Sequence, residues 1–184
     1  MLAIVVTAIS CTKVDQVQSS NNDHIKSIST EVGTVQEFLY DHSGKIVEDH
    51  GRFSFNKYLY DKDERLVKIE TAFDESVSSS SAVSVGKSEL MTSANSTMNW
   101  YRLFQYDDQG KLQKIENFFL IGGKFEYRSM LTFEFDGDHI VKENLHDDTG
   151  KITQIHLYVY DENGNITNDK YYSTISYAEP ELIS

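Results

Sequence analysis

One short unit recurs five times in this chain and constrains its fold more than any other feature. Each copy has two aromatic residues one position apart, followed at once by an aspartate. The five copies are Phe38/Tyr40/Asp41, Tyr58/Tyr60/Asp61, Phe104/Tyr106/Asp107, Phe133/Phe135/Asp136 and Tyr158/Tyr160/Asp161. Aromatic residues at alternate positions favour a strand, and an aspartate directly after them favours a turn. The repeat therefore predicts a series of β-hairpins.

The residues after each aromatic pair predict the tip of a hairpin. In the pattern Asp-x-x-Gly, the aspartate accepts a backbone hydrogen bond, and the glycine supplies the positive φ that closes a type I turn through a bulge. The complete pattern stands at 41–44, 107–110 and 161–164, and without the aromatic pair at 147–150. Two copies depart from it, because Glu64 replaces the glycine in one and Gly137 comes early in the other. We expect those two tips to be strained or of another turn type.

A three-residue bulged loop also predicts a register and two faces. It pairs Tyr106 with Leu112 and Phe104 with Lys114, and it sets Asp107 opposite Lys111 as a cross-strand ion pair. In the second hairpin one face is then apolar and forms the core, with Phe53, Phe55, Leu59, Val67, Ile69 and Phe73. The other face is mixed, with Phe38, Tyr58, Phe104 and Tyr158 alternating with Glu48, Lys68, Lys114 and Asn168.

Period-2 segments separated by turn residues predict a domain that is nearly all β. The expected strand pairs are 34–40 with 45–49, 53–60 with 65–73, 98–106 with 111–120, 124–135 with 139–146, and 151–160 with 165–172. Tight connections favour an antiparallel meander of about ten strands, built from five hairpin repeats, as an open curved sheet or a porin-like barrel. The exception is residues 74–97, a serine-rich segment that we expect to be a long loop.

The N-terminus resembles a lipoprotein signal. The apolar run from Met1 is too short to span a bilayer as a helix and ends in Ala8-Ile9-Ser10-Cys11, which resembles the lipobox of bacterial lipoproteins. Cys11 is the only cysteine, and it is the residue that would carry the lipid. We therefore expect a signal peptide at 1–10, a polar tether at 11–30, the repeat domain at 31–176 and a tail at 177–184.

Charge limits the classes of partner. The chain has 17 basic and 29 acidic side chains in 184 residues, a net charge of -12. This balance argues against nucleic acid and anionic lipid surfaces as partners, and leaves neutral or cationic ligands.

The repeat itself resembles a known family. Tyr106-Asp107 with Gly110-Lys111-Leu112 looks like the YD repeat of Rhs-type surface proteins. Following a lipobox, it is similar to repeat-bearing lipoproteins of unknown function from Bacteroidota. The resemblance covers about 34 to 172 and implies hairpin architecture without implying an activity. Too few copies are present for an enclosing Rhs shell, so the delivery role of Rhs proteins is not expected.

Motifs for catalysis, metals and cofactors are absent or incomplete, so we predict no enzyme, no catalytic residue, no metal site and no cofactor. Ser84-Val85-Gly86-Lys87 spells Ser-x-x-Lys but has no companion motif. The six histidines form no zinc-type pair. The acidic tip at Asp161, Asn163 and Asn165 matches only the start of a calcium loop.

The sequence favours a non-enzymatic binding module in the bacterial cell envelope. Lipid on Cys11 would anchor it to the outer membrane, on the periplasmic side or at the cell surface. Glycans and peptides are the candidate ligands, and the candidate contacts are Tyr58, Tyr60, Tyr158 and Tyr160 on the aromatic side of the hairpins. One alternative is a structural or interaction module of a surface assembly, and another is a hydrolase with an unrecognised site.

The lipobox reading gives a first prediction. Expressed protein should partition with membranes and carry a diacylglyceryl mass on Cys11, and Cys11→Ser should release it into the soluble fraction. Mass spectrometry and membrane fractionation measure both outcomes. A soluble, unmodified wild-type chain that retains Met1 would contradict the predicted anchor.

Overall fold

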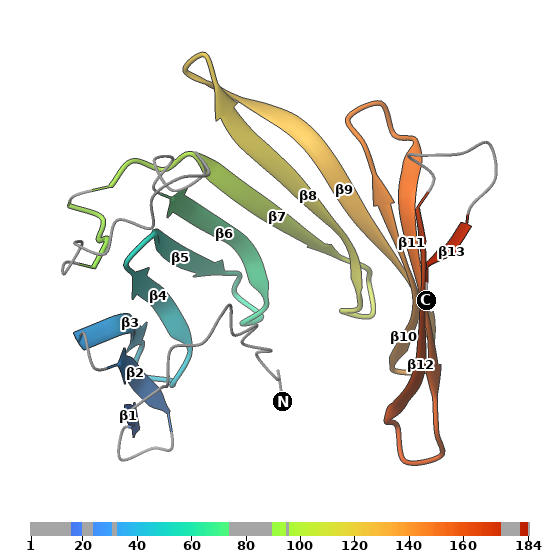
Figure 1. Ribbon diagram of the computed structural model, residues 1–184, viewed down its shortest axis with the longest axis horizontal. Helices are drawn as coiled ribbons and strands as arrows, with labels where there is room; N and C mark the ends of the chain where they lie inside the picture. Colours follow the sequence, from blue (N-terminus) through green and yellow to red (C-terminus); the bar gives the residue numbers. More distant parts are fainter. Residues whose placement is uncertain are drawn as a thin grey trace. The chain divides into compact units, whose positions relative to one another are not determined.

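The computed structural model describes residues 16–19, 24–30, 33–73, 90–94, 96–173 and 181–183 (Figure 1). These residues form antiparallel strands, with no helix among them. The strands are β1 (Gln16–Ser19), β2 (Ile25–Thr30), β3 (Gly33–Tyr40), β4 (Ile46–Gly51), β5 (Ser54–Tyr60), β6 (Leu66–Phe73), β7 (Trp100–Tyr106), β8 (Leu112–Ile121), β9 (Lys124–Asp136), β10 (His139–His146), β11 (Ile152–Tyr160), β12 (Ile166–Ser173) and β13 (Glu181–Ile183).

The strand order in the sheet is the order in the chain, from β1 to β13. The predicted all-β antiparallel meander is therefore confirmed, in its open form. The ten strands expected between 34 and 172 correspond to β3 through β12, each end lying within about two residues of its expected position. The described strands fall into two compact units that divide within β5, after Asn56. The second unit comprises Lys57–Ala72 and the residues from Thr97 on.

Strand structure extends into both ends of the chain, which differs from expectation. β1 and β2 lie within the segment predicted to be a tether, and β13 lies within the predicted tail. These short strands pair with their neighbours through backbone groups, for example β2 with β3 and β13 with β12. A strand held by backbone pairing at the edge of a sheet needs no period-2 apolar pattern, and this is why the sequence pattern did not reveal them.

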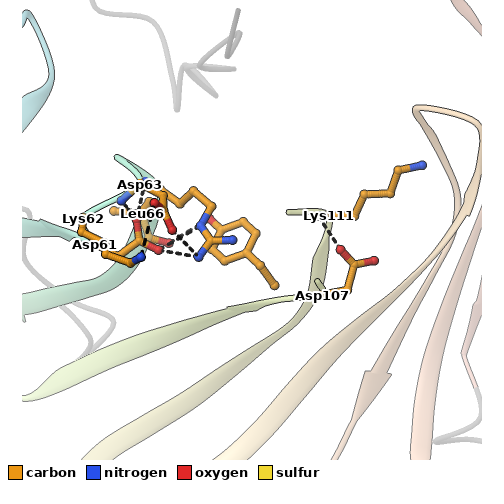
Figure 2. A network of polar contacts seen from close by, with 8 residues as sticks. Asp61, Lys62, Asp63, Leu66, Asp107 and Lys111 are labelled. Atoms are coloured by element: carbon orange, nitrogen blue, oxygen red, sulfur yellow. Dashed lines mark hydrogen bonds and ion pairs between the residues drawn. The ribbon is translucent and has the colours of Figure 1, made fainter. Parts of the chain in front are cut away.

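The hairpin tips have the predicted chemistry. At Asp107 the backbone N–H of Lys111 donates to Oδ1 at 2.8 Å (Figure 2), and the backbone N–H of Gln109 donates to the same oxygen at 2.9 Å. Gly110 N–H donates to the Asp107 carbonyl at 3.0 Å and has φ 81°. Pairs of carboxylate bonds of this kind recur at Asp41, Asp61, Asp147 and Asp161. These bonds fix the direction in which each chain segment returns.

The two deviant tips also behave as expected. Glu64 has φ 65°, a left-handed conformation that costs a residue with a Cβ about 1–2 kcal/mol. The tip at Gly137 is of another type, because Asp136 pairs directly with His139 and leaves a two-residue turn. Gly137 is its first central residue and has φ 57°, as a type II′ turn requires.

The predicted faces, however, are wrong by one residue. Tyr106 pairs with Leu112 as expected, but a bulge follows, so that Gln105 pairs with Lys114 and Phe104 with Ile115. The extra residue of a bulge shifts every later pair, and residues that face one another share a side of the sheet. Phe104 therefore lies on the side of Ile115, not on that of Lys114. The same shift separates Phe38 from Glu48 and Tyr158 from Asn168.

The expected ion pair between Asp107 and Lys111 is also replaced. The Lys111 side chain points away from the Asp107 carboxylate (Figure 2). Its ammonium group donates to the carbonyl of Gly137 and lies 3.8 Å from Asp138 Oδ1, both in the next hairpin. Lys111 thus links two hairpins, whereas its predicted role was within one.

A row of ring contacts joins successive hairpins at their tips, and we call it the tip ladder. In each link, a residue at or just before the start of a return strand lies against the second aromatic residue of the next hairpin. The links are His24 with Tyr40 at 4.8 Å, Arg65 with Tyr106 at 5.1 Å, Lys111 with Phe135 at 5.5 Å and His139 with Tyr160 at 4.5 Å. Each tyrosine hydroxyl also donates to the carbonyl just beyond its partner, at Ile25, Leu66 and Ile140.

The apolar core of the described residues is small. Its buried apolar side chains are Phe55, Ile69, Ala72 and Met91. Phe55 and Ile69 of the predicted apolar set are buried, whereas Phe53 of the same set is 37% exposed. Since few side chains are removed from water, the fold depends largely on its turns and on the contacts between hairpins.

The two kinds of tip give opposite predictions. Gly110→Val should lower the free energy of unfolding by about 1–2 kcal/mol, because a β-branched residue is strained at positive φ. Glu64→Gly should be neutral or stabilising, because it removes a strain that is already present. Urea denaturation of both variants measures this. An equal loss of stability in the two would contradict the equivalence of these turns.

Candidate functional site

Of the four tyrosines predicted to contact a ligand, Tyr160 belongs to the tip ladder. Its hydroxyl donates to the Ile140 carbonyl at 2.7 Å, and its ring stacks on His139. Tyr60 occupies the same position in its own repeat and is half-buried. Tyr160 therefore has a structural role in joining two hairpins.

Tyr158 lies in a polar cluster on β10, β11 and β12. Its side chain is half-buried and hydrogen-bonds to Glu143, and Asp169 lies opposite it in the register. Burial, followed by the negative charges of Glu143 and Asp169, raises the pKa of the Tyr158 hydroxyl well above its usual value. His156 lies beside it, with Nδ1 3.3 Å from Asp169 Oδ1. Tyr158 is thus a neutral hydrogen-bonding group at any physiological pH.

Tyr58 lies near Arg102 of β7, and an electrostatic interaction between the two favours the charged guanidinium. The candidate tyrosines therefore form two separate pairs, Tyr58 and Tyr60 in β5 and Tyr158 and Tyr160 in β11. β5 and β11 are six positions apart in the sheet, roughly 29 Å at the usual strand spacing of about 4.8 Å. The structure does not bring Tyr58 and Tyr158 together into one site.

Arg102 lies in the middle strand of a group of residues that share one side of the sheet. No pattern in the sequence predicted this group. Arg102 faces Ile69 of β6 and Asn117 of β8, and two residues earlier Trp100 faces Thr71 and Phe119. These six residues share one side of the sheet, and we call them the arginine face. The guanidinium carbon lies 4.7 Å from the centre of the Trp100 ring, a cation–π contact. Trp100 stacks in turn on Phe119, with ring centres 5.4 Å apart.

The opposite side of the same strands carries an aromatic patch, made of Tyr101, Phe118, Phe125 and Tyr127. Tyr101 stacks on Phe118 at 4.6 Å, and Phe125 meets Tyr101 edge-on at 4.8 Å. Phe118 also contacts Tyr127 at 5.8 Å. Phe125 is 42% exposed and the other three rings are half-buried. These rings come from three adjacent strands and form a surface that a flat or apolar ligand could cover.

A hollow of about 430 Å³ lies in the first unit, beside the first link of the tip ladder. It is lined by His24, Lys26, Glu37, Phe38, Leu39, Tyr40, Asp41, His42 and Gly44. The Tyr40 hydroxyl donates to Ile25 and is committed to the fold. The hollow brings charges of both signs together without a preference for one class of ligand.

The structure tests only some of the predictions about sites, because it describes only part of the chain. Cys11 and most of the serine-rich loop lie outside them. Within the part of the chain that the structure describes, no three histidine, cysteine or acidic side chains gather as a metal site would require. No helix of that part is long and apolar enough to cross a membrane.

Comparison with known proteins finds only distant structural similarity. No protein-family model matches the chain, and no curated protein sequence matches it. Among solved structures, TcdB2-TccC3-Cdc42 is similar over 87% of this chain, with a TM-score of 0.44 and 11% identity, but the chain spans only 10% of that protein. TcdB2-TccC3-TEV gives a TM-score of 0.33 at 7% identity, over 84% of this chain and 11% of that one.

A DUF3836 family protein from Parabacteroides distasonis ATCC 8503 gives a TM-score of 0.31 at 12% identity, over 66% of this chain and 94% of that one. All three TM-scores lie below 0.5, and none of the three identities exceeds 12%. They do not bear on activity.

The role of Tyr160 can be tested by removing its hydroxyl. Tyr160→Phe should lower the free energy of unfolding by about 0.5–1.5 kcal/mol, because the Ile140 carbonyl loses its donor. Tyr101→Phe is the matched control, since the Tyr101 ring stacks on Phe118 and its hydroxyl has no partner among the described residues. Chemical denaturation of both variants distinguishes the roles. Equal stabilities for the two variants would mean that the Tyr160 hydroxyl does not help to join the two hairpins.

Proposed function

We propose that this chain is a non-enzymatic binding module of the bacterial cell envelope, anchored to the outer membrane by lipid on Cys11. Its ligand is neutral or cationic, a glycan or a peptide. The aromatic patch is the observation that carries this proposal. Tyr101, Phe118, Phe125 and Tyr127 form an aromatic surface in contact with water, and surfaces of this kind commonly bind ligands or partners.

The surroundings of the patch support the choice of ligand. On the same side of the sheet, Lys68 pairs with Glu70 at 2.6 Å and Lys114 pairs with Glu116 at 2.9 Å. Local charges are therefore largely balanced, while the whole chain carries a net charge of -12. An anionic polymer is repelled at long range, whereas a neutral glycan or a cationic peptide is not.

A second candidate function is a structural module within a surface assembly. The observation in its favour is the linear order of strands, which leaves β1 and β13 as the edge strands of the described sheet. Edge strands present backbone groups to which another chain can add a strand. Such a module would bind copies of itself or a partner protein through its edges and would not need the aromatic patch.

A binding array separates the two functions. The full-length Cys11→Ser chain, labelled on its surface lysines, is presented with neutral and acidic glycans and with neutral, basic and acidic peptides. We expect retention of neutral or basic probes, and loss of that retention in Phe125→Ser, which changes an exposed ring of the patch. Ile121→Ser, an exposed apolar residue near the same tip, is the matched control.

Light scattering on the same preparations gives the other half of the test. A monomer that retains array probes supports the binding module. A concentration-dependent oligomer that retains none contradicts it and favours the assembly module.

A further inference from the structure

Arg102 differs from every other half-buried cation of the second unit. The others are Arg65, Lys68, Lys111, Lys114 and Lys142, and each lies within 3.8 Å of a carboxylate. Arg102 has no carboxylate partner among the described residues. The lysines of this unit that lack such partners are exposed, so water solvates them. Among the described cations of this unit, Arg102 alone combines partial burial with the lack of a carboxylate partner in the described part of the chain.

The arrangement of the strands explains why local acids do not reach Arg102. Glu70 pairs with Tyr101, and Glu116 pairs with Leu103, so both carboxylates project from the opposite side of the sheet. On its own side Arg102 meets Ile69, Asn117 and the Trp100 ring. The Asn117 amide already donates to Ser129 Oγ at 3.0 Å. The arginine face is therefore locally cationic within an acidic protein.

Partial burial without a partner has an energetic consequence. A charge removed from water is normally compensated by an opposite charge or by hydrogen bonds. Burial lowers the pKa of the Arg102 guanidinium from its usual value, although the group stays charged. Arg102 Nε and Trp100 Nε1 are both buried with no hydrogen-bond acceptor among the described residues. Two neighbouring donors on one side of the sheet thus lack acceptors.

We propose that Arg102 and Trp100 form a binding site for a carboxylate group carried on a flat or apolar body. The planar guanidinium presents paired N–H donors that match the two oxygens of a carboxylate. The cation–π contact with Trp100 restrains the position of the guanidinium group. The Trp100 and Phe119 rings then contact the body of the ligand, and Tyr58 lies near the charged group.

The chemistry favours a single carboxylate over a polyanion. One guanidinium neutralises about one negative charge, and the net charge of -12 opposes the approach of a highly charged ligand. Such a carboxylate occurs at the C-terminus of a peptide and on an acidic sugar. The site does not depend on the aromatic patch, which lies on the opposite side of the strands, so it stands or falls independently of the proposed function.

Trp100 makes the site directly measurable, because it is the only tryptophan in the chain. Its fluorescence in the full-length Cys11→Ser protein is followed during titration with four small probes. N-acetylphenylalanine is compared with its amide, and galacturonate with galactose. We expect a saturable change with a carboxylate probe and none with its neutral counterpart. The amino-acid pair tests a peptide C-terminus as the source, and the sugar pair tests an acidic glycan.

The variants separate ligand binding from a structural role. Arg102→Met should weaken carboxylate binding by about tenfold or more, because it removes charge-assisted hydrogen bonds. Arg128→Met is the control, since Arg128 is exposed and already lies 3.8 Å from Asp148, and it should bind as wild type does. Arg102→Lys keeps the charge without the paired donors, and its affinity should lie between the two. In the absence of ligand, Arg102→Met should leave Tm unchanged or raise it, because it removes an uncompensated charge.

Three results would overturn the proposal. They are a wild-type chain that shows no saturable response to either carboxylate, an Arg102→Met protein that binds as well as wild type, and an Arg102→Met protein that melts several degrees lower than Arg128→Met. The last result would mean that Arg102 has a partner within the chain. If Arg102→Met fails to fold, Arg102→Lys still decides the matter, because unchanged affinity in that variant excludes a site that depends on the guanidinium.

Discussion

The contact between the tip of one hairpin and the second aromatic residue of the next is the interaction on which the described sheet depends most. The residue before a return strand covers that ring, and the tyrosine hydroxyl donates to the following carbonyl, as Arg65, Tyr106 and Leu66 do. Each link ties one hairpin to the next. Where Phe135 lacks a hydroxyl, Lys111 makes the inter-hairpin bond from the other side. With few side chains fully buried, such lateral contacts largely fix how hairpins align.

The bulge beside each tip has an equally large effect on function, because it decides which residues share a side of the sheet. Without it, Phe104 would lie over Lys114. With it, Trp100, Arg102 and Phe104 all lie on the side of Ile115, while the lysine–glutamate pairs project from the other side. The one-residue shift therefore replaces the predicted apolar and mixed faces with two others. One carries an aromatic patch among balanced charges, and the other is the arginine face.

The sequence predicted the hairpins well because their information is local. Aspartate and glycine at fixed spacing determine a turn within four residues, so the strands of β3 through β12 and the strained Glu64 could be located without knowing the fold. The two faces of the sheet could not be predicted, because they depend on a bulge next to the turn. That bulge shifts the register by one residue along the whole return strand. β1, β2 and β13 were not predicted, because only their backbone pairing in the structure reveals them. Arg102 escaped because no local pattern shows that a charge lacks a partner.

The arginine face also shows why net charge is a poor guide to a single site. Among the described residues, several carboxylates lie at the tips or pair with lysines, where they already accept hydrogen bonds from the turns or from ammonium groups. Screening by salt confines the effect of an exposed charge to about 8–10 Å. Glu70 and Glu116 project from the opposite side and are themselves paired with lysines. Arg102 therefore experiences a local environment of aromatic and amide groups, in which a single carboxylate is the complementary charge.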